Sequence, residues 1–513
     1  MNQLIYLTHR IYDSLEKGLD VCFVSLDASA AFDRVWHRGL ILKLRKIGIR
    51  GPLLEWIKSY LKNRKQRVVI EGKHSQWHPV NSGVPQGSIL GPLLFLIYTN
   101  DITDDIDSDI LLFADDTCLL EPITDRLLSF NKINKDLQTL ADWASQWLVK
   151  FNPTKTKYMI FSKKMNRPNY NPLFLQNKQL EEVKVLKHLG LTFNNKMTWD
   201  NHIDRICSDA GRRLSVIKRL PISITPFTKI HIYKTFIRPV LEYASVIFDN
   251  CTADASNKIE HIQRQAAISA TRAYNKTSSH ALLEECGLDP LKERCTFAKI
   301  VTFYKIKKEI TPAYLHDLLP AEIRNTTDHN LRNRNNIRLP KITANYFLKS
   351  YIPSSIRLWN DLRDDLKLLT TLDTFKIHLR QIYCKTETYK PYLVGQTTGH
   401  IHLSRLRMDL SGLNAHRHKH HFIDHNICPS CNAINENIDH FLLICPVYAA
   451  QRRALLDHFE RLLPDLGHSL DRLENRRNRT QIIQILTFGT KNENIDNQLL
   501  KYVAKFIDET HRF

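Results

Sequence analysis

The stretch 111–120, "LLFADDTCLL", places two adjacent carboxylates, Asp115 and Asp116, inside an otherwise apolar run. Apolar runs of this length, bounded by polar residues, are typical of buried strands. A tight hairpin lets the residues at its tip reach solvent while the flanking strands stay buried. We therefore predict strands over 109–113 ("DILLF") and 117–123 ("TCLLEPI"), with the two aspartates projecting together from one edge of a sheet.

A third carboxylate, Asp27, follows the apolar run 20–26, "DVCFVSL", which we predict to be a buried strand. Adjacent carboxylates repel each other, and a divalent cation between them reverses the sign of the interaction. Asp is also a common turn residue, so "ADD" alone favours an ordinary turn, and only the surrounding stretches favour a metal site. If the strand before Asp27 lies beside the hairpin, three carboxylates converge. That arrangement suits Mg²⁺ and two-metal phosphoryl transfer.

The neighbouring stretches mix helical and strand patterns, which indicates an α+β domain. The segment 51–63 begins a helix with Pro52 in its first turn. Its predicted apolar face comprises Leu53, Trp56, Ile57, Tyr60 and Leu61. Further predictions are an amphipathic helix over 1–18, a helix ending near Gly48, two strands across a turn at Gly72, a buried helix over 89–102, a helix over 125–150 and a strand over 157–162.

The whole chain is strongly basic. Its 513 residues, enough for two to four domains, carry 73 Lys and Arg against 53 Asp and Glu, a formal charge of +20. Such a surplus indicates an acidic polymer or a membrane surface as partner, although a merely soluble basic protein is also compatible with charge alone. No apolar run approaches the roughly 20 residues that span a bilayer. We therefore expect nucleic acid and no membrane.

Basic residues gather in two runs and cysteines in one. The basic runs are Lys62, Arg64, Lys65 and Arg67, then Arg212, Arg213, Lys218 and Arg219. Counterion release predicts nucleic-acid binding that weakens with salt, and solvated charge is the alternative, above all for the second run. The ten cysteines are mostly scattered, which favours a reducing compartment. With no signal peptide visible, we expect an intracellular protein of the nucleus or cytoplasm.

Five stretches, in chain order, resemble the reverse transcriptases of non-LTR (LINE-like, jockey-related) retrotransposons. They are "FVSLDASAAFD" (23–33), "SGVPQGSILGPLLF" (82–95), "FADD" (113–116), "WLVKFNPTKTKYMIFS" (147–162) and "KHLGLTF" (187–193). Five ordered motifs are far more specific than any one of them. A weaker resemblance continues through 237–248 and 354–366. The resemblance implies a right-hand polymerase palm followed by a helical thumb.

The resemblance also implies roles for single residues. Asp27, Asp115 and Asp116 would bind two Mg²⁺ ions, and the ring of Phe32 would exclude a ribose 2′-hydroxyl. Gly83, Pro85, Gln86 and Gly87 would lie against the incoming nucleotide and the template, and Lys155 would protonate the leaving pyrophosphate. Residue chemistry leaves alternatives open, because an aromatic ring usually packs in a core, glycines often serve turns and a lysine is usually solvated.

A cluster near the C-terminus has the spacing C-x2-C-x8-H-x4-C, formed by Cys428, Cys431, His440 and Cys445. Three thiolates and an imidazole suit one tetrahedral, structural Zn²⁺, and buried cysteines with a surface histidine are the alternative. A short helix would carry His440, and the segment offers too few apolar residues to form a core alone. The cluster resembles the C-terminal knuckle of the same family. The tract "HRHKHH" (416–421) is expected to be a solvated basic face that touches phosphates.

We predict four regions: a palm over 1–195, a helical thumb-like region over 196–310, a linker and downstream mixed region over 311–410, and a zinc knuckle with C-terminal helices over 411–513. Mixed structure is expected over 347–460. The chain has only 26 residues before Asp27. That leaves no room for the family's fingers motifs or its N-terminal endonuclease, so we expect an N-terminally truncated enzyme.

The predicted function is an RNA-directed DNA polymerase of a non-LTR retrotransposon. It would add deoxynucleotides from their triphosphates to a DNA primer on an RNA template. The alternative is a non-catalytic nucleic-acid-binding protein derived from such an element. The three aspartates favour the enzyme, and the missing fingers favour the binding protein. No oligomeric state is predicted.

Overall fold

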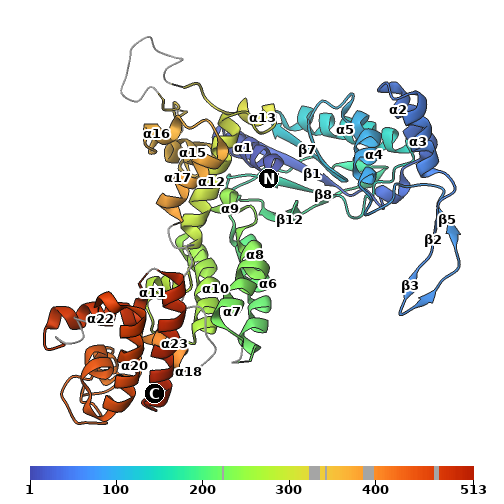
Figure 1. Cartoon of the computed structure of the whole chain (residues 1–513). Coiled ribbons are helices and arrows are strands. Elements are labelled where there is room, and N and C mark those ends of the chain that lie inside the picture. The colour runs from blue at the N-terminus through green and yellow to red at the C-terminus, as the bar shows by residue number, and fades with distance from the viewer. Residues whose placement is uncertain (222–223, 323–334, 341–343, 385–397, 467–472, 491) are drawn as a thin grey trace. The chain divides into compact units, whose positions relative to one another are not determined.

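The computed structural model describes all residues except 222–223, 323–334, 341–343, 385–397, 467–472 and 491 (Figure 1). The described chain forms two compact units. Unit 1 is Met1–His202 with Ile306–Asp361, and unit 2 is Ile203–Lys305 with Leu362–Phe513. The predicted division into four regions stays a prediction. Most of the Asn-rich stretch in the predicted linker, "RNTTDHNLRNRNN", lies outside the described residues.

Unit 1 is built on a five-stranded sheet with the order β11-β8-β1-β7-β6. Strand β1 pairs antiparallel with β7 on one side and with β8 on the other, and β6 and β7 form the predicted hairpin. The mixed helix-and-sheet character and the strands around Asp115 are thus confirmed. The strand bounds are β1 Asp20–Leu26, β6 Asp109–Phe113, β7 Asp116–Ile123, β8 Lys157–Phe161 and β11 Glu181–Glu182.

Helices cover both faces of this sheet (Figure 1). The long helix α5 (Arg126–Gln146) begins at Asp125, whose carboxylate accepts the Leu128 N–H at 2.8 Å. It packs against the face that carries Val24 and Leu119, a cross-strand pair of the buried core. On the opposite face lies the predicted N-terminal helix, α1 (Asn2–Glu16), whose Gln3 contacts the Cys118 thiol. Alternate residues of each strand are therefore buried against different helices.

Three further helices form a second core beside the sheet, namely α2 (His37–Lys46), α3 (Gly51–Leu61) and α4 (Leu90–Thr99). The predicted apolar face of α3 is partly wrong. Leu53 and Trp56 are 52% and 55% exposed, and the buried positions are Leu54, Ile57 and Leu61. The buried residues repeat at i, i+3 and i+7, as on one face of a helix. Each of Leu54 and Ile57 follows a predicted residue, Leu53 or Trp56, by one position, so the buried face is rotated by one residue from the predicted one.

A fully exposed hairpin, the arm, connects α3 to the glycine-rich loop before α4. It consists of β2 (Lys65–Gln66), β3 (Val69–Ile70), β4 (Lys73–His74) and β5 (His78–Pro79). Its tip is the predicted turn at Gly72, where Glu71 and Gly72 both have positive φ, +48° and +79°. A two-residue turn of this kind matches the twist of the strands that it joins. In Figure 1 the arm extends away from the sheet.

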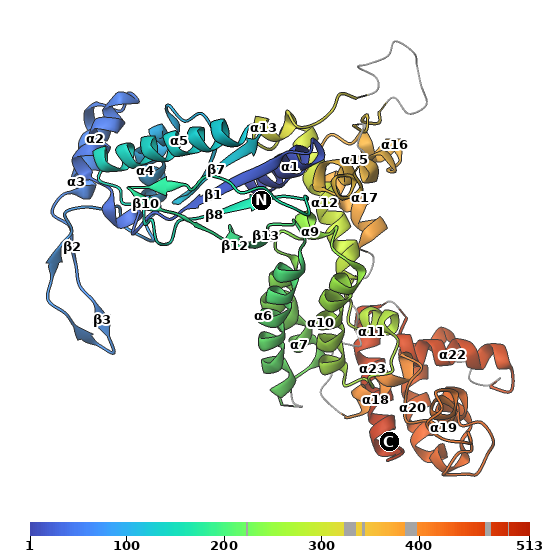
Figure 2. The same cartoon turned by 180° about the vertical axis from the view of Figure 1, so that it is seen from behind.

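The predicted hairpin over 187–193 is also present. Strands β12 (Val185–His188) and β13 (Leu191–Asn194) join at Leu189 and Gly190, again with positive φ. In Figure 2 this hairpin lies next to β8. The ring of Phe193, on β13, contacts the rings of Phe161 on β8 and of Trp199. The remaining elements of unit 1 are the β9–β10 hairpin (Phe174–Leu175, Lys178–Gln179) and helices α13 (Ala313–His316), α14 (Asn345–Leu348) and α15 (Tyr351–Asn360).

Unit 2 is helical, as predicted for 200–310. Over 347–460 the regular elements among the described residues are all helices, where the sequence predicts mixed structure. None of the described helices is long and apolar enough to cross a membrane. The main helices are α6 Asp200–Arg219, α7 Pro226–Ile232, α8 Arg238–Glu242, α9 Ser245–Phe248, α10 Ala253–Thr271, α11 Ser279–Glu285, α12 Leu291–Lys307, α16 Asp364–Lys367, α17 Leu372–Tyr383, α18 Thr398–Arg407, α19 Asn414–Lys419, η6 His440–Ile444, α20 Ala449–Leu462, α22 Arg476–Phe488 and α23 Glu493–Glu509.

Candidate functional site

The three aspartates lie at the adjoining ends of β1 and β7. In the antiparallel register Ser25 faces Cys118 and Leu26 faces Thr117, so one further step sets Asp27 opposite Asp116. Directly opposed residues of such a pair have Cβ atoms roughly 4.5–5.5 Å apart. Both aspartates belong to the face of the sheet that carries Cys118, because side chains alternate along a strand. Asp115 occupies the hairpin tip after Ala114, which has a positive φ of +52°.

The charges of these carboxylates interact. Partial removal from water raises the pKa of Asp116, and the negative charges of Asp115 and Asp27 raise it further. A carboxyl group with this pattern lacks a compensating cation. Among the described residues, however, the three aspartates do not form a group close enough to share one ion as they stand; the Cys/His cluster near the C-terminus is the group that does. The aspartates have the right donor chemistry for Mg²⁺, and closing around an ion would require their side chains to move.

Asp27 is held by its backbone. Its N–H donates to the Thr156 hydroxyl at 3.2 Å, and its carbonyl accepts the Asn152 N–H at 2.8 Å. Thr156 is fully buried, and Ala28 bridges to Phe151 in the same segment. The fourth motif, 147–162, therefore fixes the position of the first. The sequence prediction missed Asn152 and Thr156, since no local pattern reveals contacts across about 125 residues.

The glycine-rich loop packs directly on the loop after Asp27. The Gly83 N–H donates to the Val35 carbonyl at 2.8 Å, and the Val84 N–H donates to the Phe32 carbonyl at 2.9 Å. A Cβ added at Gly83 would lie 2.8 Å from the Asp33 Cα atom, and φ at Gly83 is +88°. Gly83 is therefore required by close backbone packing.

Gly87 differs, although its φ is also positive, at +81°. A Cβ there would meet nothing within 4 Å. The Gln86 amide donates to the Asp33 carboxylate at 3.1 Å, so this side chain links the two loops. The space beside Gly87 is open, so a ligand can approach the backbone there. This is the surface that the sequence predicts to meet the nucleotide.

Phe32 and Lys155 lie in contrasting surroundings. The Phe32 ring is partly buried and stacks on Phe95, with centroids 4.4 Å apart and planes 20° apart. The stacking fixes the orientation of the Phe32 ring. A fixed ring is consistent with a packing role and with the predicted exclusion of a 2′-hydroxyl. Lys155 is exposed, and its backbone N–H closes a turn onto the Asn152 carbonyl at 3.1 Å. The roles of both residues stay predictions.

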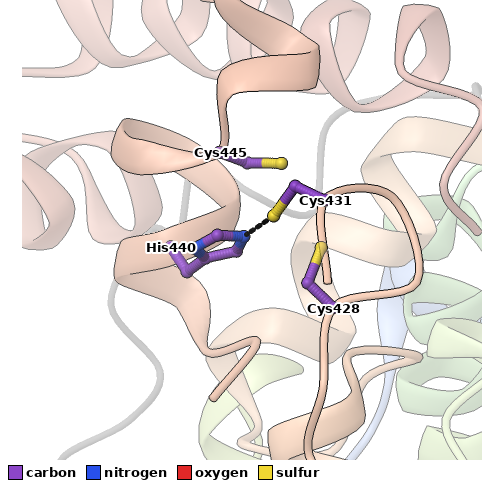
Figure 3. Close-up of side chains that lie close together, drawn as sticks. All are labelled: Cys428, Cys431, His440 and Cys445. Carbon is purple, nitrogen blue, oxygen red and sulfur yellow. Dashed lines mark hydrogen bonds between the residues drawn. The ribbon is translucent and has the colours of Figure 1, made fainter. Parts of the chain in front are cut away.

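Cys428, Cys431, His440 and Cys445 point toward one another (Figure 3). One ligand atom from each lies within 4.8 Å of all the others, and the Cys431 sulfur and His440 Nε2 are 3.2 Å apart. A tetrahedral zinc site with bonds of about 2.0–2.3 Å places its donor atoms roughly 3.3–3.8 Å apart. The cluster fits Zn²⁺ after a contraction of about 1 Å along its longest edge.

The surroundings of the cluster lower the pKa of Cys431 and favour a neutral imidazole at His440. Burial alone would raise the pKa of Cys431. Hydrogen bonds from the Ala433 N–H and from the thiols of Cys428 and Cys445 have the larger combined effect, so the pKa of Cys431 is lowered. Burial raises the pKa of Cys445 to about 12. Burial, with Arg452 nearby, lowers the pKa of His440. The neutral form is the one that binds a metal.

The segment around His440 does not form a core alone, as the sequence predicts, but shares one with distant helices. Phe441, Leu442 and Leu443 are buried, and they pack with residues of α18, α20, α22 and α23 in one apolar cluster. Helix η6 carries His440, as predicted. Long-range packing supplies the core that the local sequence lacks.

Between the cluster's ligands, Glu436 is almost fully buried and receives two bonds from the Arg512 guanidinium, both 2.6 Å. In the tract 416–421, Arg417, His418, Lys419 and His421 are exposed, as expected for a basic face. His416 is the exception. It is buried, and its Nδ1 lies 2.9 Å from the Ser411 hydroxyl.

The two basic runs differ. In the arm every residue from Lys65 to Pro79 is exposed, and Arg67 stacks over the Trp77 ring at 4.7 Å. In α6 the cations contact their own unit: Arg213 donates to the Phe236 carbonyl at 2.8 Å and Lys218 donates to Gln265 at 3.1 Å. The sequence prediction missed Trp77, although an aromatic residue amid basic ones is a signal for binding single strands.

Comparison with known proteins finds similarities that cover part of the chain. Residues 5–193 match the family described as Reverse transcriptase (RNA-dependent DNA polymerase). Over 57% of its length the chain is 29% identical to the probable RNA-directed DNA polymerase from transposon BS of Drosophila melanogaster, and covers 34% of that protein. Over 46% it is 31% identical to the RNA-directed DNA polymerase from mobile element jockey of the same organism, covering 27%. The chain thus spans about a third or less of these relatives.

Among solved structures, the chain is similar to that of apo telomerase from Candida tropicalis. The likeness covers 52% of this chain and 45% of that one, with 13% identity and a TM-score of 0.31. At that score the likeness carries no argument about this chain.

Proposed function

We propose that this chain, which carries a LINE-like, jockey-related reverse transcriptase domain, is an RNA-directed DNA polymerase that extends a DNA 3′ end on an RNA template. The observation that carries the proposal is the register of β1 and β7, which brings Asp27 and Asp116 to neighbouring strand ends with Asp115 beside them. Burial raises the pKa of Asp116 and the negative charges of Asp115 and Asp27 raise it further, which supports a cation as the partner of these carboxylates.

In this proposal Asp27, Asp115 and Asp116 hold two Mg²⁺ ions. These carboxylates would hold the ions where Mg²⁺ would supply Lewis-acid chemistry to a 3′-hydroxyl and neutralise charge on a triphosphate. The residues of this chain supply position. Asn152 and Thr156 fix Asp27 through its backbone, which limits the carboxylate to a small region at the end of β1. Pre-organisation of this kind lowers the cost of aligning the reacting groups.

The incoming nucleotide is proposed to lie over the loop that contains Gly87, with Gln86 and Gly83 behind it. The open space beside Gly87 supports this placement. Phe32, fixed by Phe95, would meet the sugar, so a deoxynucleotide would fit where a ribonucleotide would clash. The exposed Lys155 would approach the pyrophosphate as a proton donor.

The partners proposed are an RNA template and a DNA primer. The arm supports this, because it exposes Lys62, Lys65 and Arg67 together with the ring of Trp77. Phosphates pair with such cations, and bases stack on such rings. Cys428, Cys431, His440 and Cys445 are proposed to hold one structural Zn²⁺ that fixes the loop between Cys428 and His440.

A second candidate function is nucleic-acid binding without catalysis. It is favoured by one observation: every residue of the arm from Lys65 to Pro79 is exposed and Arg67 stacks over the Trp77 ring, a surface that binds nucleic acid without need of a catalytic centre. In that case the arm and the basic surface of unit 2 would act without turnover.

Primer extension separates the two. Purified full-length chain is given an RNA template with an annealed DNA primer, deoxynucleoside triphosphates and Mg²⁺. The proposal expects extension that ends on addition of EDTA and is lost in Asp115→Asn, while that variant still binds the template–primer. Binding without extension by the unaltered chain would support the second candidate and reject the first.

A further inference from the structure

An open pocket in unit 2 has no role in the proposed polymerase site. Its volume is about 460 Å³, within the range of roughly 300–1,000 Å³ typical of small-ligand sites. The pocket lies between the chain after α10, the chain after α19 and the C-terminal end of α23. Its lining is Tyr274, His402, Leu410, Ser411, Gly412, Arg417, Phe422, Arg512 and Phe513.

Aromatic rings dominate this lining. Tyr274 and Phe422 are 41% and 45% exposed and belong to none of the core clusters described above. Phe513 stacks on His402, with centroids 4.7 Å apart and planes 14° apart. Burial, followed by the nearby charge of Arg405, lowers the pKa of His402 to about 4, so this ring is neutral near pH 7. The pocket therefore offers flat, uncharged faces on which another ring can stack.

Positive charge surrounds these rings. Arg405 lies over the Tyr274 ring and Lys276 over the Phe422 ring, each 4.5 Å from the centroid. Arg417 is exposed and lines the pocket, and no carboxylate side chain is among the lining residues, all of which are described. Glu436 neutralises Arg512, so Arg417 is the cation of the lining that is available to a ligand. The chemistry thus suits an aromatic ligand that carries a negative charge.

The rings are held before any ligand arrives. Two guanidinium bonds from Arg405, at 2.7 and 3.1 Å, reach the Arg272 carbonyl and fix the turn that carries Tyr274. On the other side, the bidentate pair of Arg512 and Glu436 fixes the chain next to Phe513. A preformed site loses less conformational freedom on binding.

We propose that this pocket binds one nucleotide of a single-stranded RNA or DNA, with its base stacked on Tyr274 or Phe422 and its phosphate paired with Arg417. A nucleotide within a duplex does not present its base face, so the ligand is a single strand. The site is separate from the proposed polymerase site and does not require catalysis. Through this site unit 2 would bind a single strand without regard to its base sequence.

Crosslinking tests the position of this contact. Full-length chain is irradiated with a 12-nucleotide oligouridylate that contains 4-thiouridine, and the crosslinked peptides are identified by mass spectrometry. The proposal expects adducts on the peptides that contain Tyr274 or Phe422. The Asp115→Asn variant should give the same adducts, because a failed polymerase site leaves this pocket intact. Adducts confined to other peptides would overturn the proposal.

Affinity measurements provide the matched control. Phe422→Ala and Tyr274→Ala should each weaken binding of the same fluorescent oligouridylate at least about fivefold by anisotropy, the effect of losing one base–aromatic stack. Arg417→Gln should weaken it and reduce its salt dependence. Phe488→Ala removes a ring of similar exposure, 46%, that is not part of the pocket, and should change nothing.

Two results would contradict the proposal. One is an affinity that Phe422→Ala and Tyr274→Ala leave unchanged when circular dichroism shows both variants folded. The other is uridine monophosphate binding as tightly as the oligouridylate, which would make the site one for free nucleotides.

Discussion

At the scale of single residues, the site depends on three carboxylates that the pairing of β1 with β7 brings to neighbouring strand ends. Asp27 and Asp116 end or begin paired strands, and Asp115 adds a third negative charge at the hairpin tip. Without a cation, the electrostatic repulsion between these carboxylates destabilises the folded state. The same arrangement that supports catalysis therefore reduces stability, as is common at functional sites.

This repulsion predicts that Asp116→Asn makes the chain more stable near pH 7 while abolishing primer extension. Because the folded state raises the pKa of Asp116, the ionised group costs stability above that pKa, and the cost disappears as pH falls below the unfolded value of about 4. Thermal unfolding in EDTA should show a higher melting temperature for the variant at pH 7 and a smaller gap at pH 4. A matched surface control is Asp142→Asn on α5. A variant that melts below the unaltered chain at pH 7 would contradict this.

The sequence alone identifies the carboxylates but not what holds them. Asp115 and Asp116 interrupt a strand pattern, which is a local signal. Asn152 and Thr156 act on Asp27 through backbone hydrogen bonds that depend on which strands pair. A single sequence does not reveal strand order, so such supporting residues appear only in the structure.

At the scale of elements, the two glycines of the loop before α4 have different tasks. Both have positive φ, so replacement by Ala costs roughly 1–2 kcal/mol of backbone strain at either position. Only at Gly83 does the new methyl group also overlap the Asp33 backbone. Gly83→Ala should therefore lower the melting temperature clearly more than Gly87→Ala. Equal losses, or a larger loss at Gly87, would show that the packing of these loops is described wrongly.

The cluster of Cys428, Cys431, His440 and Cys445 makes a second prediction at this scale. Full-length chain should contain one zinc per molecule by elemental analysis, and Cys428→Ser should lose it. Hydrogen exchange should then rise over the loop 428–437, while Phe441–Leu443 stay protected because they are buried in the shared core. Cys384→Ser, outside the cluster, should keep its zinc.

Zinc retained in full by Cys428→Ser, or absent from unaltered chain refolded with excess metal under reducing conditions, would reduce the cluster to packed cysteines. The spacing alone made this cluster predictable, since tight Cys pairs recur in metal sites. Its place in a larger helical core was not predictable, because α18, α20, α22 and α23 come from separate parts of the chain.

At the scale of the whole molecule, a charge of +20 predicts binding that falls steeply as salt rises. In the structure the two basic runs differ in how far their cations are already engaged in contacts within the chain. Replacing Lys62, at the end of α3, and Lys65, at the start of the arm, together by Gln should reduce the slope of log affinity against log salt by about 2. Replacing Arg213 and Lys218 should change the slope less, because both are engaged within unit 2. Template–primer affinity at several salt concentrations measures this, and equal effects of the two pairs would contradict it.

The broad architecture was accessible from the sequence because its elements carry strong local patterns. The strands β1, β6, β7 and β8 and the helices α1 to α5 were predicted near their observed bounds. The buried face of α3 was not predicted correctly, because helical periodicity alone does not show which of two adjacent apolar faces packs against another helix. The exposed arm and the aromatic pocket of unit 2 likewise depend on tertiary structure.

The central claim is that the aspartates at the ends of β1 and β7 hold divalent cations. Iron(II) bound in place of Mg²⁺, with hydrogen peroxide as oxidant and ascorbate to regenerate Fe(II), generates hydroxyl radicals that cut the backbone next to the ion, so the cut sites locate the metal. The claim predicts cleavage of full-length chain near Asp27 and near Asp115–Asp116. Excess Mg²⁺ should suppress it, and the double variant Asp115→Asn, Asp116→Asn should lose it. Cleavage confined to other segments, or unchanged in the double variant, would contradict the claim.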